Sequence, residues 1–297
     1  MTIPQILIRW VSLALAPPSC CLCGGRGELW SGPEPGLIGR WHRMPLDLCQ
    51  YCLAALPRPR AHWTQARTAG PGCAQFAALQ YRPPVDHLIR QFKFAGVRSY
   101  GRVLATLLGQ ARAAERDRPL PEALVPVPMH ARRFRERGLD HTLLLARWAA
   151  EACAVPVLAD WLVRVKATPP QTGLSGATRR HNVQGAFAVR PIASTARGRV
   201  PRQVALLDDV LTTGSTLAAA GAALRAAGVE RIEHWVLART VLTEDVVERD
   251  ADEDHEPGIA VFEKRLEALL RVAPADQPLL AQETHPQRRN AQLVPGA

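Results

Sequence analysis

The stretch ALLDDVLTTGSTL, residues 205–217, carries the pattern that decides the fold of this 297-residue chain. Apolar residues over 204–207 predict a buried strand, and Asp208 and Asp209 stand at its carboxyl end. A turn of small residues follows, consisting of Thr212, Thr213, Gly214, Ser215 and Thr216. We expect a helix to begin at Leu217. Because ligands bind outside the carboxyl ends of strands in open α/β sheets, this stretch predicts a ligand site.

The turn and the acidic pair together predict recognition of a phosphorylated ribose. A helix N-terminus presents free amides and the positive end of its dipole, so it binds phosphate, and Gly214 lets the backbone approach the anion. Asp208 and Asp209 would repel phosphate, but they suit the two ribose hydroxyls and, at one remove, Mg²⁺. The alternative is a capped helix after a strand, which the acidic pair disfavours. A Walker A loop is excluded because Gly-Lys-Thr/Ser is missing at that spacing.

Alternating helix and strand patterns surround this stretch from about residue 75 to 243. Helical spacing is present over 85–114 with a break near Gly96, over 140–154 with Asp140 as N-cap, and over 215–228 with Gly228 at the end. Short apolar runs predict strands over 123–129, 161–165, 186–189, 203–209 and 231–240. Strands separated by helices favour a parallel sheet covered on both faces, so the predicted class is α/β. Residues 168–185 lack periodicity and predict a long loop.

Seven cysteines include two C-x-x-C pairs, Cys20 with Cys23 and Cys49 with Cys52. Each such turn brings two thiolates to about 3.5–4 Å, as two corners of a tetrahedron require, and four thiolates close the shell of a structural Zn²⁺. Disulfides, or thiols whose site has lost its metal, remain the alternatives. Of the other three cysteines, Cys21 is a candidate spare ligand. We expect Cys73 and Cys153 to be small buried residues.

Charge is unevenly distributed along the chain. The net formal charge is +10, but residues 244–297 contain 12 acidic and 6 basic residues and carry −6, which leaves +16 on residues 1–243. A body this basic attracts polyanions such as nucleic acid, phosphorylated metabolites or anionic lipid. An Arg-rich surface that serves solubility is the alternative. No run of 18 apolar residues exists, so we expect no membrane span and a cytoplasmic protein, with an amphipathic helix over 1–16 favoured over a signal peptide.

The stretch 204–217 resembles the signature of type I phosphoribosyltransferases, which bind 5-phosphoribosyl-1-pyrophosphate (PRPP). Three further segments, 88–96, 124–147 and 168–189, resemble one branch of these proteins, the ComF family, which is linked to DNA uptake in natural competence. Members of that branch also carry an N-terminal Cys₄ zinc module. The resemblance covers roughly residues 17–240 and implies a phosphoribosyltransferase-type parallel sheet flanked by helices, with a small zinc-ribbon module.

The resemblance implies roles at matching positions. Asp208 and Asp209 would hold the ribose hydroxyls as the catalytic pair, and 212–216 would hold the 5-phosphate. The turn after LVPVP matches the loop that meets pyrophosphate, and its residues are Met129 and His130, with Arg132 and Arg133 after them. For these arginines, the start of a solvated helix is the alternative role. The loop over 168–185 corresponds to the one that closes over the site, with expected contacts from Gln171, Arg179, Arg180 and Asn182.

Three units and three functions follow as expectations. We predict a helix and zinc module over 1–72, the phosphoribosyltransferase-like domain over 73–243, and a largely disordered tail over 244–297 with one helical stretch. The first function is handling of single-stranded DNA in competence, with PRPP or a nucleotide in the pocket and competence-machinery proteins as partners. The second is phosphoribosyl transfer from Mg²⁺–PRPP to a nitrogen nucleophile. The third is a non-catalytic sensor of PRPP or nucleotide.

Overall fold

A five-stranded sheet forms the centre of the computed structural model, which describes residues 18–31, 43–66, 73–130, 134–135, 138–166, 185–191 and 199–240. The strand order is β3-β4-β9-β8-β5. Four strands run parallel and β3 runs antiparallel to β4 at one edge. The strands are β3 (Trp63–Gln65), β4 (Ala74–Gln80), β5 (Ala123–Pro126), β8 (Gln203–Leu211) and β9 (Arg231–Arg239).

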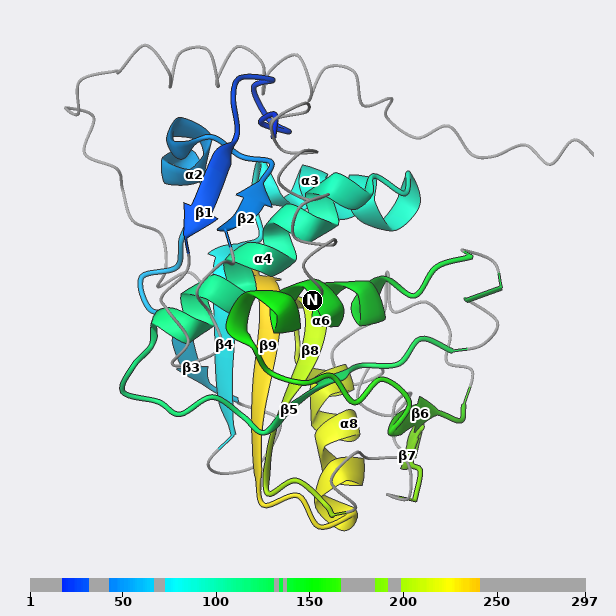
Figure 1. Cartoon of the computed structure of the whole chain (residues 1–297). Helices are drawn as coiled ribbons and strands as arrows, with labels where there is room; N and C mark the ends of the chain where they lie inside the picture. The colour runs from blue at the N-terminus through cyan, green and yellow to red at the C-terminus, as the bar shows by residue number, and fades with distance from the viewer. Residues whose placement is uncertain are drawn as a thin grey trace, which may run out of the picture.

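Helices cover both faces of this sheet, as the continuous apolar runs of its strands predict. On β8, Ala205 and Leu207 belong to the core under three helices, whereas Val204 and Leu206 pack on the opposite side. The first face carries α3 (Val85–Phe94), α4 (Arg98–Ala114) and α6 (His141–Cys153), and the second carries α8 (Ser215–Ala226). Figure 1 shows α4 and α6 lying across the sheet. The predicted α/β class, a parallel sheet flanked by helices, is confirmed.

Strand β8 is longer than the predicted strand over 203–209. It continues to Leu211, because Val210 and Leu211 still pair with Ala238 and Arg239 of β9. Helix α8 begins at Ser215, as the helical spacing over 215–228 predicts, and not at Leu217. Ser215 and Thr216 therefore belong to the first helical turn, and only 212–214 form the connection.

On the face of the sheet opposite α8, two helix boundaries agree with the sequence prediction. Helices α3 and α4 are separated at Gly96, which has a φ of +69° that favours glycine. Asp140 caps α6, since its side chain accepts a hydrogen bond of 3.0 Å from the Leu143 amide. These two boundaries fix where α3 ends and where α6 begins, close to the site described below.

Two small antiparallel sheets flank the main one. The first pairs β1 (Glu28–Ser31) with β2 (Arg43–Leu46) and is followed by α2 (Gln50–Ala55), beyond α4 in Figure 1. Leu46, Leu48 and Leu56 of this region share one core with α3 and α4. The second pairs β6 (Leu162–Arg164) with β7 (Phe187–Val189) near α8. The predicted small N-terminal cysteine module is thus present and packs directly on the α/β unit.

The sheet also contains two strands that the sequence analysis does not predict, β3 and β4. Because β3 comes from the predicted N-terminal unit and pairs with β4, residue 72 falls between two adjacent strands of one sheet. The unit boundaries at 72 and 243 stay predictions, and the helices expected over 1–16 and in the tail lie outside the described residues. Every helix in the described ranges is too short or too polar to cross a lipid bilayer.

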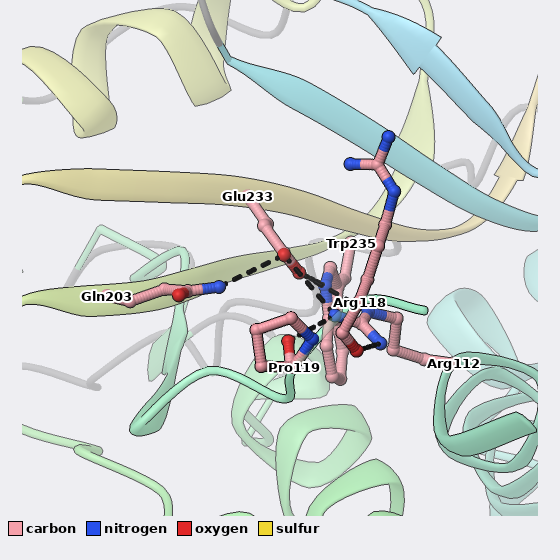
Figure 2. Close-up of polar contacts among 6 residues, drawn as sticks. All are labelled: Arg112, Arg118, Pro119, Gln203, Glu233 and Trp235. Atoms are coloured by element: carbon pink, nitrogen blue, oxygen red, sulfur yellow. Dashed lines mark hydrogen bonds and ion pairs between the residues drawn. The ribbon is translucent and has the colours of Figure 1, made fainter. Parts of the chain in front are cut away.

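A buried arginine ties the helical layer to the sheet (Figure 2). Arg112 of α4 has no exposed surface, and its Nε and Nη2 donate to the Glu233 carboxylate of β9 at 3.4 and 3.3 Å. The same guanidinium donates to the carbonyl oxygens of Arg118 and Pro119, at 3.1 and 2.7 Å. One side chain thereby satisfies a buried carboxylate and the loop that follows its own helix.

Aromatic rings and further donors complete the surroundings of that ion pair. The Arg112 guanidinium lies 5.1 Å from the ring centroid of Trp63 and 5.5 Å from that of Trp235, within cation–π range. Glu233 also accepts from the Trp235 indole at 2.8 Å and from the Gln203 amide at 3.2 Å. The network therefore joins β3, α4, β8 and β9.

Candidate functional site

A cavity of about 240 Å³ lies beside the end of β8, at the carboxyl edge of the parallel strands. Five segments that are separated in the sequence form its wall. The lining residues are Lys93 and Phe94 from the end of α3, 127–129 after β5, Thr142 of α6, Arg164 of β6, and 208–217. The acidic pair and the start of α8 thus face one cavity, at the place where α/β sheets bind ligands.

The two carboxylates of the site are held by different partners. Asp209 forms an ion pair with the Lys93 ammonium through Oδ2, and its Oδ1 accepts the Val210 amide at 2.6 Å. Asp208 accepts the Asp209 amide at 2.9 Å. Burial and the charge of Asp209 raise the pKa of Asp208 to about 7, although Lys93 and Arg164 act in the opposite direction. A cation or a set of hydroxyl donors near this pair would relieve the unfavourable charge.

The start of α8 has the geometry of an anion site. Gly214 precedes the helix with a φ of +72°, and no side chain of the described residues caps the helix. The first amides of any α-helix lack acceptors within the helix, and Ser215, Thr216 and Leu217 at the positive end of the α8 dipole line the cavity. The hydroxyls of Thr213 and Ser215 lie 3.1 Å apart beside them. This arrangement supplies neutral donors for a phosphate without adding a positive side chain.

The remaining predicted contacts are placed only in part. Met129 lines the cavity, whereas His130 is not among the described residues that line it. The carbonyl oxygen of His130 accepts a hydrogen bond of 3.1 Å from the Phe134 amide. The other predicted contacts lie outside the described residues, namely Arg132, Arg133, Gln171, Arg179, Arg180 and Asn182. The assignment of all these residues to a ligand stays a prediction.

The wall residues that sequence reasoning misses include Lys93, Phe94 and Arg164. Lys93 and Phe94 end a helix that lies more than 110 residues before the acidic pair, and Arg164 belongs to a short strand of a separate sheet. Their sequence signal is weak, because basic and aromatic residues at a helix end usually face solvent. The segment 88–96 resembles the ComF family as a whole, but that resemblance does not indicate which of its residues face the site.

The four cysteines of the two C-x-x-C pairs form one cluster. Their Sγ atoms all lie within 4.8 Å of one another, and those of Cys23 and Cys49 are 3.7 Å apart. Tetrahedral Zn²⁺ with sulfur ligands separates them by about 3.8 Å, so the donor set and spacing fit that ion. Four thiolates leave no open position, which makes the site structural. The cluster can bind a metal such as zinc.

Backbone geometry supports the sulfur cluster. The amides of Cys23 and Gly25 point at the sulfurs of Cys20 and Cys23, at 3.5 and 3.4 Å. A Cβ on Gly25 would lie 3.3 Å from the Cys23 sulfur, so glycine permits this approach. A hydrogen bond from the Cys52 thiol lowers the pKa of Cys20 to about 4 and raises that of Cys52. The sulfurs are thus close enough to share protons that a metal would displace.

The other three cysteines stand outside this cluster. Cys21, considered above as a spare ligand, is not among the four clustered residues, and its amide donates to the Asp47 carbonyl oxygen at 2.9 Å. Cys73 and Cys153 are buried, as predicted. All seven cysteines are free in the structure.

Comparison with known proteins reveals relatives across most of the chain. It is 37% identical over 223 residues to competence protein F of Haemophilus influenzae, which covers 73% of this chain and 90% of that protein. DNA utilization protein YhgH of Salmonella typhi is 29% identical, over 76% of this chain and 98% of that protein. Its Escherichia coli K12 counterpart is 28% identical, over 72% and 98%. No protein-family profile matches the chain.

Similarity to solved structures is low. Glutamine PRPP amidotransferase from B. subtilis is 17% identical with a TM-score of 0.31, over 56% of this chain and 34% of that one. Adenine phosphoribosyltransferase from Leishmania donovani is 14% identical with a TM-score of 0.30, over 66% and 94%.

Proposed function

Because the chain belongs to the ComF family, we propose that it takes part in DNA uptake in natural competence, handling single-stranded DNA while its pocket binds Mg²⁺–PRPP or a nucleotide. The observation that carries the pocket half of this proposal is the meeting of the acidic pair and the start of α8 in one cavity. The names of the relatives, competence protein F and DNA utilization protein, support the DNA half.

The cavity wall offers groups that would suit each part of PRPP. The amides at the start of α8 and the hydroxyls of 212–216 would bind the 5-phosphate. Asp208 and Asp209 would accept hydrogen bonds from the ribose hydroxyls and face Mg²⁺, which when bound neutralises the pyrophosphate. Lys93 and Arg164, both on the cavity wall, would attract the pyrophosphate. The 127–129 segment would meet it from the side of β5.

Titration calorimetry of Mg²⁺–PRPP tests the pocket. We expect Asp208→Asn and Asp209→Asn each to weaken binding by about 10-fold or more, since each removes a charged acceptor from a ribose hydroxyl. Asp117→Asn provides the matched control, because Asp117 is exposed and lies away from the cavity. If PRPP binds the two site variants as tightly as the wild type, the pocket assignment is wrong.

Electrostatics support the DNA half of the proposal. Residues 1–243 carry a net formal charge of +16. When basic side chains neutralise the phosphates of a nucleic acid, the counterions condensed on that nucleic acid are released. The affinity for a single-stranded oligonucleotide should therefore fall steeply between about 50 and 200 mM salt. Repeating the PRPP titration with the oligonucleotide already bound then reports whether the two ligands compete. Absent or salt-independent DNA binding would remove this half.

A second function, phosphoribosyl transfer, is favoured by the two cations beside the acidic pair. In that reaction a nitrogen nucleophile bonds to C1 of the ribose while the bond from C1 to the pyrophosphate oxygen breaks, and the nucleophile loses its proton to water. Lys93 and Arg164 would hold the leaving pyrophosphate. Pyrophosphate release from PRPP with a panel of bases and amines tests this. No release across the panel, with PRPP bound, favours the sensor function instead.

The N-terminal cluster completes the proposal. Cys20, Cys23, Cys49 and Cys52 would hold one structural Zn²⁺ that stabilises the region packed on α3 and α4. Action in the cytoplasm and contact with other competence proteins are part of the same proposal. Affinity capture with the full chain, comparing wild type and Asp208→Asn, would report whether pocket occupancy affects such contacts.

A further inference from the structure

The aromatic residue of the cavity wall has no role in the proposal above. Phe94, the last residue of α3, is 71% exposed, the largest fraction of any large hydrophobic side chain in the described residues. It nevertheless lines the cavity, next in sequence to Lys93, which contacts Asp209. An exposed aromatic ring therefore lies on the wall of a polar pocket, next to the lysine that pairs with Asp209.

Helix packing, rather than a loop, positions this ring. Two residues earlier, Phe92 is fully buried and meets the His141 ring edge-on at a centroid distance of 5.0 Å. A Cβ on Gly101 of α4 would lie 2.5 Å from the Phe92 ring, so α3 and α4 approach closely there. The Ala95 amide then closes the helix on Gln91 at 3.0 Å. Phe94 is thus presented by the rigid end of α3.

The chemistry of the ring limits what it can recognise. A phenyl group has no hydrogen-bond donor, and the negative face of its π-system does not attract phosphate. It does bind the flat face of a nucleobase, in stacks that tolerate any base. In the proposed function, Lys93 attracts the pyrophosphate on C1, which would put the C1 substituent of a bound ribose near the end of α3. A base on C1 would then lie near Phe94, the residue that follows Lys93.

We propose that Phe94 is the stacking face for the base of a 5′-ribonucleotide whose sugar phosphate fills the pocket. This inference rests on the proposed ribose-phosphate site and names the ligand class of that site. A nucleotide within a DNA strand fits less well, because it lacks the 2′-hydroxyl and places a 3′-phosphodiester against two carboxylates. The base of a mononucleotide is consequently the occupant that the charges favour.

Calorimetry with two ligands that differ only by the base tests the inference. Adenosine 5′-monophosphate and ribose 5-phosphate are titrated into the full chain with Mg²⁺, for the wild type, Phe94→Ala and Phe94→Tyr. We expect Phe94→Ala to weaken the nucleotide by about 5- to 150-fold, the range for loss of one base stack, and to leave ribose 5-phosphate within about 2-fold. Phe94→Tyr should keep both affinities. Tyr51→Ala, at a residue 44% exposed on α2, is the aromatic control.

Each other outcome overturns the inference in a distinguishable way. Equal nucleotide affinity in the wild type and Phe94→Ala removes the stacking role while ribose 5-phosphate binding keeps the proposed function. An equal loss for both ligands means that the ring supports the pocket itself. If Phe94→Ala weakens only a single-stranded oligonucleotide titrated in the same way, the ring is assigned to the strand. If neither small ligand binds the wild type, the proposed function fails and this inference fails with it. Circular dichroism melting verifies that each variant is folded.

Discussion

Lys93 Nζ and Asp209 Oδ2 form an ion pair that connects the end of α3 to the acidic pair of β8. Both side chains are mostly buried, so this contact neutralises one of two adjacent carboxylates in a poorly solvated site. The neighbouring carboxyl of Asp208 has a pKa raised to about 7, so a second negative charge is unfavourable at this site. Helix α3 is therefore part of the site electrostatically as well as by position.

A double-mutant cycle measures the strength of that contact. We expect Lys93→Met to destabilise the protein, because it leaves Asp209 without its cation, and Lys93→Met/Asp209→Asn to recover most of the loss. The coupling free energy should be about 1–2 kcal/mol, above the values of exposed pairs. Urea unfolding of the wild type and the three variants provides the measurement. Additivity of the two single changes to within about 0.3 kcal/mol would contradict the interpretation.

Acid should destabilise the protein through His234. This ring is 1% exposed, its Nδ1 lies 3.4 Å from the Gln75 amide nitrogen and its Nε2 lies 3.3 Å from the Cys73 sulfur. The amide donates, so Nδ1 is an acceptor and the ring is neutral. Burial, with a contribution from Arg225, lowers the pKa of His234 to about 4.

The sign of the pH effect follows from that difference. Between about pH 6.5 and 4 the unfolded chain binds a proton on this histidine that the folded protein does not bind. The contribution of His234 to the free energy of unfolding is therefore fully present above about pH 6.5 and decreases on acidification. From pH 7.5 to 5 this single group should account for about 2 kcal/mol. His234→Gln removes the group, and the decrease measured by urea unfolding should be smaller by that amount. Parallel pH profiles for the two proteins would refute the assignment.

Removal of the metal should destabilise more than the N-terminal region. Cys49→Ser is expected to abolish binding of about one zinc per chain and to lower Tm by at least about 5 °C, since Leu46 and Leu48 share a core with α3 and α4. A colorimetric zinc assay and thermal melting give the two readouts. Cys21→Ser is the matched control and should retain the metal. Zinc retained by Cys49→Ser would exclude the four-sulfur site.

The buried arginine provides a stability test independent of the site. Arg112→Met leaves the Glu233 carboxylate buried without a cation, so we expect a loss of about 3–5 kcal/mol in unfolding free energy. Arg112→Met/Glu233→Gln should regain part of it, because the uncompensated charge is gone. Arg116→Met, at an exposed position soon after α4, should change stability by less than about 0.5 kcal/mol. Chemical denaturation compares all four proteins.

Local patterns explain why much of the fold is predictable from sequence. The pattern of residues 203–228 predicts a strand, a turn and a helix from neighbouring residues alone. Each C-x-x-C pair likewise predicts two metal ligands from four consecutive residues. Strand β4 does not, because it carries Gln75 and Gln80 at buried positions where a strand pattern requires apolar residues. Gln75 is tolerated there through its contact with His234, a partner about 160 residues away.

The candidate site also contains residues that the sequence predicts and residues that it does not. Its acidic pair and phosphate turn are contiguous, so the chemistry of neighbouring residues predicts them. Lys93, Phe94 and Arg164 reach the cavity only because α3 and β6 pack beside β8, and no short-range pattern encodes that packing. Likewise, β8 extends past Asp209 because β9 offers hydrogen-bond partners as far as Arg239, which the strand's own composition does not reveal.

The antiparallel position of β3 has an evolutionary consequence. Loss of everything before residue 73 would strip β4 of its neighbour, expose the ring of Phe76 that Trp63 covers, and leave a row of unsatisfied amides and carbonyls open to other chains. The segment that ends with β3 therefore protects one edge of the main sheet. A descendant of this protein that lost β3 would need another segment along β4 to avoid aggregation.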